Sequence, residues 1–128
     1  MFRNQYDSDV TVFSPQGRLF QVEYAMEAVK QGAACVGLAT ARHVVLAAIK
    51  RSPGELAASH QPKLFSVDRH VGVAIAGLTS DARVLTKTMR KSTMASRLYM
   101  ERAMPVLRVV EEVAERAQES TQYYGGRP

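Results

Sequence analysis

Apolar and polar positions along this chain follow two different periods, and each period predicts one kind of element. Residues 10–13 alternate Val10 and Val12 with Thr11 and Phe13, a period of two that is typical of a short strand. Between this segment and the next, Ser14-Pro15-Gln16-Gly17 has the residue order of a β-turn. Apolar positions then recur at steps of three and four, which predicts a helix over residues 19–30; they are Leu19, Val22, Met26 and Val29. Gln31-Gly32 follows with a glycine suited to a left-handed helix cap.

Four apolar runs of strand length come next and predict two hairpins. Residues 34–39 and 44–49 form the first, and their near-continuous apolar character indicates burial on both faces. Residues 63–67 and 71–76 form the second. The segment between the hairpins is predicted to be a loop with one short helical turn at residues 55–59.

Two helices are predicted to complete the chain. The first follows Gly77-Leu78, with Thr79 or Ser80 as its cap, and its inward stripe comprises Ala82, Leu85, Met89 and Ser92 or Ser96. The second begins at Pro105 as its first residue, and its apolar face comprises Val106, Val109, Val110, Val113 and Ala117. Four strands with two helices on one side would leave the other apolar face uncovered, so the fold is expected to be incomplete.

Composition places the chain among ordinary globular domains. It has 128 residues, 46% of them hydrophobic and 23% charged, which is enough for one domain with a core. No stretch has the length of a membrane span and the first residues lack the apolar core of a secretory signal, so we expect a soluble intracellular chain. The single cysteine, Cys35, permits no internal disulfide and is expected to be a small buried hydrophobe rather than a catalytic thiol.

The net charge of +5 raises the possibility of nucleic-acid binding. Five cations cluster in one predicted helix: Arg83, Lys87, Arg90, Lys91 and Arg97. No aromatic platform, zinc spacing or known nucleic-acid module accompanies them. We therefore favour a solvated helix face, or one that meets an acidic neighbour, and keep a basic nucleic-acid-binding domain as an alternative.

Signals for other chemistry are weak. His43, His60 and His70 lie in three different connections at spacings that match no metal motif. The serines lack a nucleophile elbow, and Gly77-Leu78-Thr79-Ser80 lacks the lysine and second glycine of a phosphate loop. We expect neither a cofactor nor a metal.

The run from Tyr6-Asp7-Ser8-Asp9 through Phe13-Ser14-Pro15-Gln16-Gly17 to Glu23-Tyr24-Ala25 closely resembles the amino-terminal signature of proteasome α subunits. The similarity continues through Gly77-Leu78-Thr79-Ser80-Asp81-Ala82-Arg83 and the closing Tyr124-Gly125-Gly126-Arg127-Pro128. It implies an α+β fold, the amino-terminal-nucleophile-hydrolase-like αββα sandwich, here only its first half, the strands and helices of one sheet and helix layer. Residues 1–33 would be the gate tail and first helix, and residues 34–128 an incomplete sandwich domain.

The resemblance also implies a function. It points to a non-catalytic structural and gating α subunit of the 20S proteasome core, which controls substrate entry and docks regulatory particles in ubiquitin-dependent degradation, in the cytoplasm and nucleus. Implied partners are other α subunits, β-ring subunits, the carboxyl-terminal tails of regulatory particles and unfolded protein substrates, with no membrane.

Catalytic β subunits of this family use a threonine, an aspartate and a lysine. The matching positions here carry Ala33 and Ile49, and only Lys63 agrees. A methyl group cannot attack a carbonyl, so hydrolysis is not expected. An active threonine-type hydrolase is the alternative.

The resemblance assigns two sites. Tyr6, Asp7, Pro15 and Tyr24 match the cluster that holds the open gate, with the two tyrosines stacking and sharing a hydrogen bond with Asp7 of a neighbouring subunit. Ser8 departs from the family, since many gates carry arginine there. Lys63 and Gly32 match the pocket that receives an activator's carboxyl-terminal carboxylate. Without the resemblance, a frayed tail and a solvated edge lysine would explain the same residues.

Overall fold

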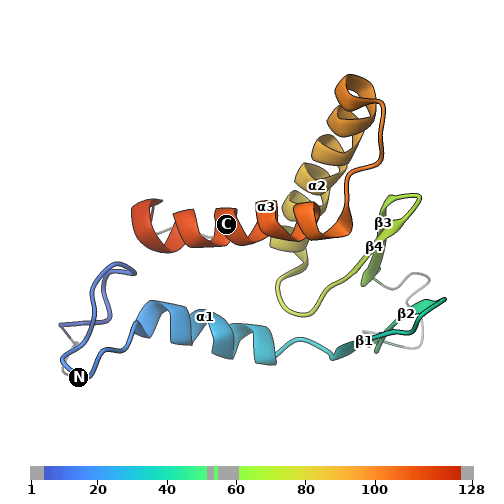
Figure 1. The fold of residues 1–128 in the computed structure, drawn as a ribbon. Helices are drawn as coiled ribbons and strands as arrows, with labels where there is room; N and C mark the ends of the chain where they lie inside the picture. Colours follow the sequence, from blue (N-terminus) through green and yellow to red (C-terminus); the bar gives the residue numbers. More distant parts are fainter. Residues whose placement is uncertain (1–4, 52–53, 55–60, 125–128) are drawn as a thin grey trace.

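The computed structural model describes residues 5–51, 54 and 61–124. Its elements, shown in Figure 1, are α1 (Phe20–Lys30), β1 (Cys35–Ala39), β2 (Val44–Ala48), β3 (Leu64–Asp68), β4 (Val71–Ala74), α2 (Thr79–Met100), α3 (Val106–Glu119) and the π-helical η1 (Ser120–Tyr124). The predicted three helices and two hairpins are present. The helical turn predicted at residues 55–59 lies outside the described residues.

The strand predicted at residues 10–13 is wrong. These residues form turns and irregular chain, and Asp9 organises them through its carboxylate. The Thr11 main-chain N–H and hydroxyl both donate to Asp9 Oδ1, each at 2.9 Å. A strand needs a ladder partner for its main-chain groups, and the short alternation at residues 10–13 has none among the described residues.

The left-handed cap predicted at Gly32 is also wrong, because Gln31, the cap residue that follows α1, has a right-handed conformation and Gly32 has no positive φ. Glycine is required there by a close approach of backbone. A Cβ at position 32 would lie 2.5 Å from the main-chain nitrogen of Gly77 and 3.0 Å from its Cα. The end of α1 therefore rests directly on the turn that leads into α2.

The two hairpins form separate two-stranded antiparallel sheets rather than one four-stranded layer. Leu46 of β2 projects between them. A Cβ at Gly37 of β1 would lie 3.0 Å from one Leu46 methyl group, and a Cβ at Gly72 of β4 would lie 3.5 Å from the other, an ordinary contact distance. Leu46 therefore lies between its own ladder partner, Gly37, and β4 of the second hairpin.

Burial of the first hairpin on both faces was expected, and that expectation is wrong. Val36 and Leu38 alternate with the inward positions of β1, and they are 68% and 67% exposed. Val45, which pairs with Leu38 across the ladder, is 59% exposed. No described residue covers this outer face, so the β1–β2 hairpin is packed on one side only.

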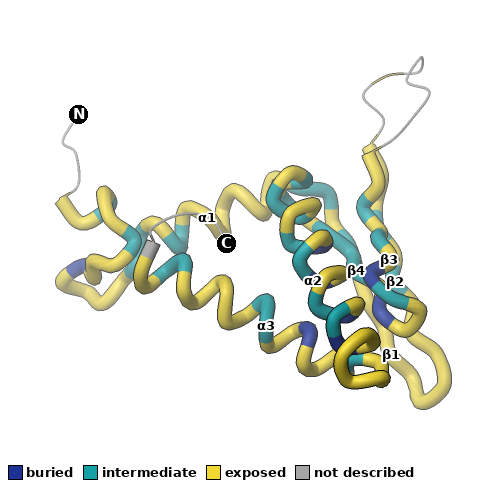
Figure 2. The backbone as a smooth tube through the Cα atoms, turned by 90° about the horizontal axis from the view of Figure 1, so that it is seen from above, coloured by how far each residue is buried: buried dark blue, intermediate teal, exposed yellow. Residues whose placement is uncertain are grey.

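The core lies where α2 and α3 meet the second hairpin, where most of the dark, buried segments of Figure 2 are found. It consists of Val67, Val71, Met89 and Val109, with Val73, Leu85, Met104 and Val113 packed around it. Met89 and Ser96 of the predicted α2 stripe are buried as expected. The core is small for the length of chain that builds it.

Two buried threonines in α2 were not foreseen. Thr86 and Thr93 are 2% and 1% exposed, and their hydroxyls donate to the main-chain oxygens of Ala82 and Arg90 at 2.7 and 3.0 Å. These local hydrogen bonds remove the cost of burying a hydroxyl among apolar side chains.

The helix ends differ from prediction in detail. Neither Thr79 nor Ser80 caps α2, because Leu78 holds the cap position and the Thr79 hydroxyl instead donates to Gln61 Oε1 at 3.2 Å. Pro105 precedes α3 by one residue. Glu101 after α2 has a left-handed φ of 54°. Among the described residues, none of the helices combines the length and apolar composition of a membrane span.

Candidate functional site

The amino-terminal tail folds back beside α1 and is fixed at its base by Ser14. This serine is 5% exposed. Its main-chain N–H donates to the Arg18 oxygen at 2.9 Å, its oxygen accepts from Gly17 N–H at 2.8 Å, and its hydroxyl accepts from Arg18 N–H at 3.0 Å. Pro15 lies in this turn, as predicted, and Gly17 takes a φ of +77° that favours glycine. Ser14 was not singled out, although serine at the first position of a turn is a known signal.

Arg18 ties the turn to the first residues of α1. Its guanidinium makes a two-pronged contact with the Glu23 carboxylate, through Nε at 2.9 Å and through Nη2, and its Cζ lies 4.9 Å from the centre of the Phe20 ring. The hydrogen bond from Arg18 lowers the pKa of Glu23 below its usual value. Phe20 in turn stacks on Tyr24, with ring centres 6.3 Å apart and planes inclined by 22°.

Asp7 contacts α1 at two points. The Gln21 side-chain amide donates from Nε2 to the Asp7 main-chain oxygen, and the Tyr24 hydroxyl lies 3.5 Å from Asp7 Oδ2. Two of the four predicted gating residues, Asp7 and Tyr24, are therefore together within one chain. The ring stacked on Tyr24 is that of Phe20, which the sequence did not single out, as it did not Gln21.

A second group of predicted residues surrounds a pocket of about 200 Å³ between the end of α1 and the two hairpins. Lys63 Nζ donates to the main-chain oxygen of Ala33, the residue that follows Gly32. The pocket is also lined by Gln31, Ile49, Lys50, Arg51, Gln61, Ile75, Gly77 and Thr79. Lys50 and Arg51, which were not predicted as site residues, add positive charge beside Lys63.

Ala33, Ile49 and Lys63, the three positions compared with a hydrolase triad, line this same pocket. The Ile49 N–H donates to the Ala34 oxygen at 3.0 Å, which extends the β1–β2 ladder by one pair and sets Ile49 opposite Ala34, the residue after Ala33. The side chains at positions 33 and 49 are hydrocarbons without a nucleophile or a base. In the described part of the chain, no group of histidine, cysteine, aspartate or glutamate is arranged to hold a metal ion.

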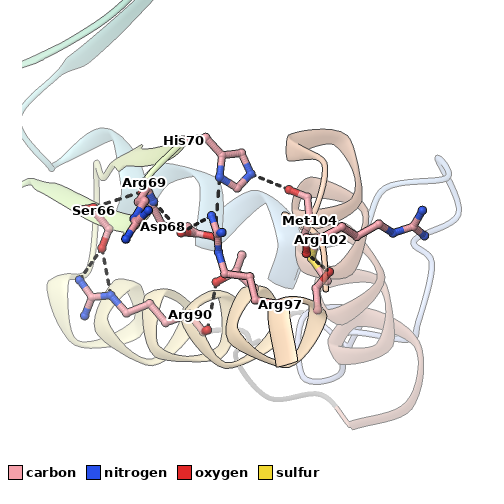
Figure 3. A network of polar contacts seen from close by, with 10 residues as sticks. Ser66, Asp68, Arg69, His70, Arg90, Arg97, Arg102 and Met104 are labelled. Atoms are coloured by element: carbon pink, nitrogen blue, oxygen red, sulfur yellow. Dashed lines mark hydrogen bonds and ion pairs between the residues drawn. The ribbon is translucent and has the colours of Figure 1, made fainter. Parts of the chain in front are cut away.

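A polar network, drawn in Figure 3, joins the β3–β4 turn to α2 and the start of α3. Arg97 contacts both carboxylate oxygens of Asp68 at 3.0 Å, and Arg90 donates to the Ser66 main-chain oxygen at 3.0 and 2.7 Å. His70 places Nε2 2.7 Å from the Met104 oxygen and Nδ1 3.6 Å from Asp68 Oδ2. The hydrogen bond from Arg97, followed by the main-chain N–H of Arg69, lowers the pKa of Asp68.

This network bears on the basic helix. Two of its five clustered cations, Arg90 and Arg97, are bound to β3 of the same chain. A surface built to neutralise phosphates would present its cations to solvent. The geometry therefore gives Arg90 and Arg97 a structural use, whereas Arg83, Lys87 and Lys91 are exposed.

Two protein-family models match this chain, one over its amino-terminal segment and one over the remainder. Residues 29–128 match the family model of proteasome subunits, and residues 6–28 match the model of the N-terminal signature of A-type proteasome subunits. The chain is 56% identical over 128 residues to the probable alpha type-6 proteasome subunit of Schizosaccharomyces pombe, covering all of this chain and 47% of that protein.

Two further relatives are named as alpha type-1 proteasome subunits. The protein of Dictyostelium discoideum is 54% identical and that of Caenorhabditis elegans 50%, each over 128 residues and all of this chain. This alignment covers 51% and 49% of the two relatives, respectively. The chain thus spans about half the length of the curated relatives it matches.

Proposed function

The chain belongs to the proteasome subunit family, and on this premise we propose that it acts as a non-catalytic α-type subunit of the 20S core particle. The observation that carries the proposal is the match of residues 6–28 to the A-type signature, together with the folding of that segment as a tail against α1. In this role the chain would contact other α subunits and β-ring subunits. Degradation of ubiquitin-marked proteins in the cytoplasm and nucleus is the corresponding cellular setting.

The assignment within the α type follows from the tail and α1. Tyr6-Asp7-Ser8-Asp9 and Met26-Glu27-Ala28-Val29-Lys30-Gln31-Gly32 most resemble the eukaryotic α type-1 subunit. Relatives of comparable identity carry the names type 1 and type 6, so the α type is the firmer level and type 1 is our finer proposal.

The absence of catalysis rests on the pocket around Lys63. A threonine-type hydrolase needs a nucleophile with a nearby base, and the side chains of Ala33 and Ile49 supply neither. The competing hypothesis of an active hydrolase predicts release of dye from fluorogenic peptides by the purified, folded chain alone. Inactivity of such a sample would exclude it.

The gate role rests on the tail cluster of Tyr6, Asp7, Pro15 and Tyr24. Pro15 fixes a turn whose displacement would shift the whole tail, and Asp7 and Tyr24 provide a hydrogen-bonding pair at its side. Such a tail would close the entry of the particle to unfolded chains in one position and admit them in another.

Removal of residues before Thr11 tests this role. In particles that incorporate this chain, the deletion should raise basal hydrolysis of small peptides, since the tail contributes to closure. The control is a deletion of the same length in another subunit of the particle, one whose amino-terminal tail does not reach the pore. Unchanged basal hydrolysis would argue against a gate.

Docking of regulatory particles is proposed for the pocket of Lys63 and Gly32. The Lys63 ammonium carries three N–H donors and its contact with Ala33 uses one. With Lys50 and Arg51 at the same pocket, the charge suits a terminal carboxylate. Glycine at position 32 lets the end of α1 lie directly against Gly77, one of the residues that line this pocket.

A further inference from the structure

The two contacts that hold Asp7 come from one face of α1. Gln21 and Tyr24 are three residues apart on a helix, so their side chains project from neighbouring positions on the same side. Gln21 reaches the main-chain oxygen of Asp7, and Tyr24 reaches its carboxylate. The tail is thereby fastened through its backbone and through its side chain at a single residue.

The backbone contact is the stronger of the two. The Tyr24 hydroxyl lies 3.5 Å from the carboxylate, at the long limit for a hydrogen bond, and both contacts are exposed to water. The Gln21 amide instead donates directly to a carbonyl oxygen, which accepts in either charge state of the Asp7 side chain.

The other end of the tail is already fixed to the beginning of α1. Ser14 closes the turn before the helix, and Arg18 binds Glu23 across the first turn. Residues 7–14 therefore form a loop with both ends attached to the same helix. Loss of the Gln21 contact removes the backbone attachment at Asp7 and leaves the turn at Ser14 in place.

We propose that Gln21 is a positioning residue for the tail, which holds the Asp7 main chain on the α1 helix of its own chain without any contribution from a neighbouring subunit. This inference rests on the proposed function only in treating the tail as a gate. The substitution Gln21→Ala removes the donor, and because alanine favours helix more than glutamine does, a weakened α1 cannot account for the result.

The test is the backbone mobility of the tail, measured by ¹⁵N relaxation on the purified chain. We expect order parameters of the Asp7 and Ser8 amides near the rigid value of about 0.85 in the wild type, and below about 0.6 in Gln21→Ala. Ala25 and Met26 within α1 should stay unchanged. Gln118→Ala, the same replacement on the exposed surface of α3, is the matched control and should leave the tail rigid.

Gln21→Lys, which restores a donor on a longer side chain, should recover part of the lost rigidity. A mobile Asp7 in the wild-type chain, or equal order parameters in wild type and Gln21→Ala, would overturn the proposal. Basal peptide hydrolysis by assembled particles reports separately on the gate. A mobile tail in Gln21→Ala with unchanged hydrolysis would support Gln21 as the anchor and reject the gate role.

Discussion

At the scale of single residues, Gly32 lies so close to the backbone of Gly77 that no side chain fits there. A methyl group at position 32 would lie 2.5 Å from a backbone nitrogen, which cannot turn aside as a flexible side chain can. We expect Gly32→Ala to lower the free energy of unfolding by about 1 to 3 kcal/mol, the usual cost of overpacking.

Urea unfolding followed by circular dichroism measures this loss. Gly54→Ala is the matched control, because a Cβ at position 54 would meet nothing within 4 Å. Equal midpoints for wild type and Gly32→Ala would show that the backbone contact is not a constraint.

Asp68 gives the molecule a predictable acid dependence. Its pKa is lowered in the folded state, chiefly by Arg97, so the ionised carboxylate stabilises the fold at pH values above its unfolded pKa of about 3.9. That contribution disappears as the pH falls through the lower, folded pKa. Asp68→Asn should therefore be less stable at neutral pH and should lose less stability on acidification.

The measurement is the free energy of unfolding between pH 6 and pH 2, written as the difference between wild type and variant so that other acids cancel. Arg97→Gln, which removes the main cause of the shift, should also flatten the profile. Parallel profiles for wild type and Asp68→Asn would contradict the assignment.

The sequence identified site residues that belong to a motif, but it did not identify residues whose role depends on a contact formed by folding. Lys63 and Ala33 could be placed together because the motif fixes their relation along the chain. Gln21 could not, since its role depends on a tail that returns to the helix from fourteen residues away. Its identity as an exposed helical glutamine carries no signal of that return.

At the scale of elements, α3 depends on one side of its surface. Val109 is 2% exposed and belongs to the core, whereas the next residue, Val110, is 57% exposed. Deleting one buried methyl group costs about 0.5 to 1.5 kcal/mol, so Val109→Ala should cost about 1 to 3 kcal/mol. Val110→Ala should change stability by less than about 0.5 kcal/mol.

Chemical denaturation of the two variants provides the comparison, with the same atoms removed from adjacent positions. A similar loss in both would mean that α3 does not dock through Val109.

The periodic pattern predicted all three helices well, because their stripes extend over several turns. It failed at residues 10–13, where four alternating residues are too few to distinguish a strand from a turn built by Asp9.

At the scale of the whole molecule, large apolar side chains remain outside the small core. Those exposed by two thirds or more are Val36 and Leu38 on the outer face of the β1–β2 hairpin, Val44 on its other face, Met94, Leu98 and Tyr99 of α2, Leu107 of α3, and Tyr123. Patches of this kind mark surfaces that other protein covers. The sequence predicted an uncovered face, but the division of the four strands into two sheets could not be read from periodicity.

The Lys63 pocket yields a prediction that only an assembled particle can test. Lys63→Ala should weaken the stimulation of peptide hydrolysis by an activator, because the carboxylate of its tail loses a charged partner. Lys87→Ala, on the exposed surface of α2, is the control. Ring assembly should be normal in both, and full stimulation in Lys63→Ala would remove this residue from the docking site.

The contact between Gly32 and Gly77 also has a consequence for the order of folding. It joins positions separated by both hairpins, and closing so long a loop costs chain entropy that only established structure can offset. Each hairpin can form locally and early, whereas the end of α1 has no surface to rest on until the turn at Gly77 exists. The helix that carries the tail is therefore expected to dock late, after the sheets that support it.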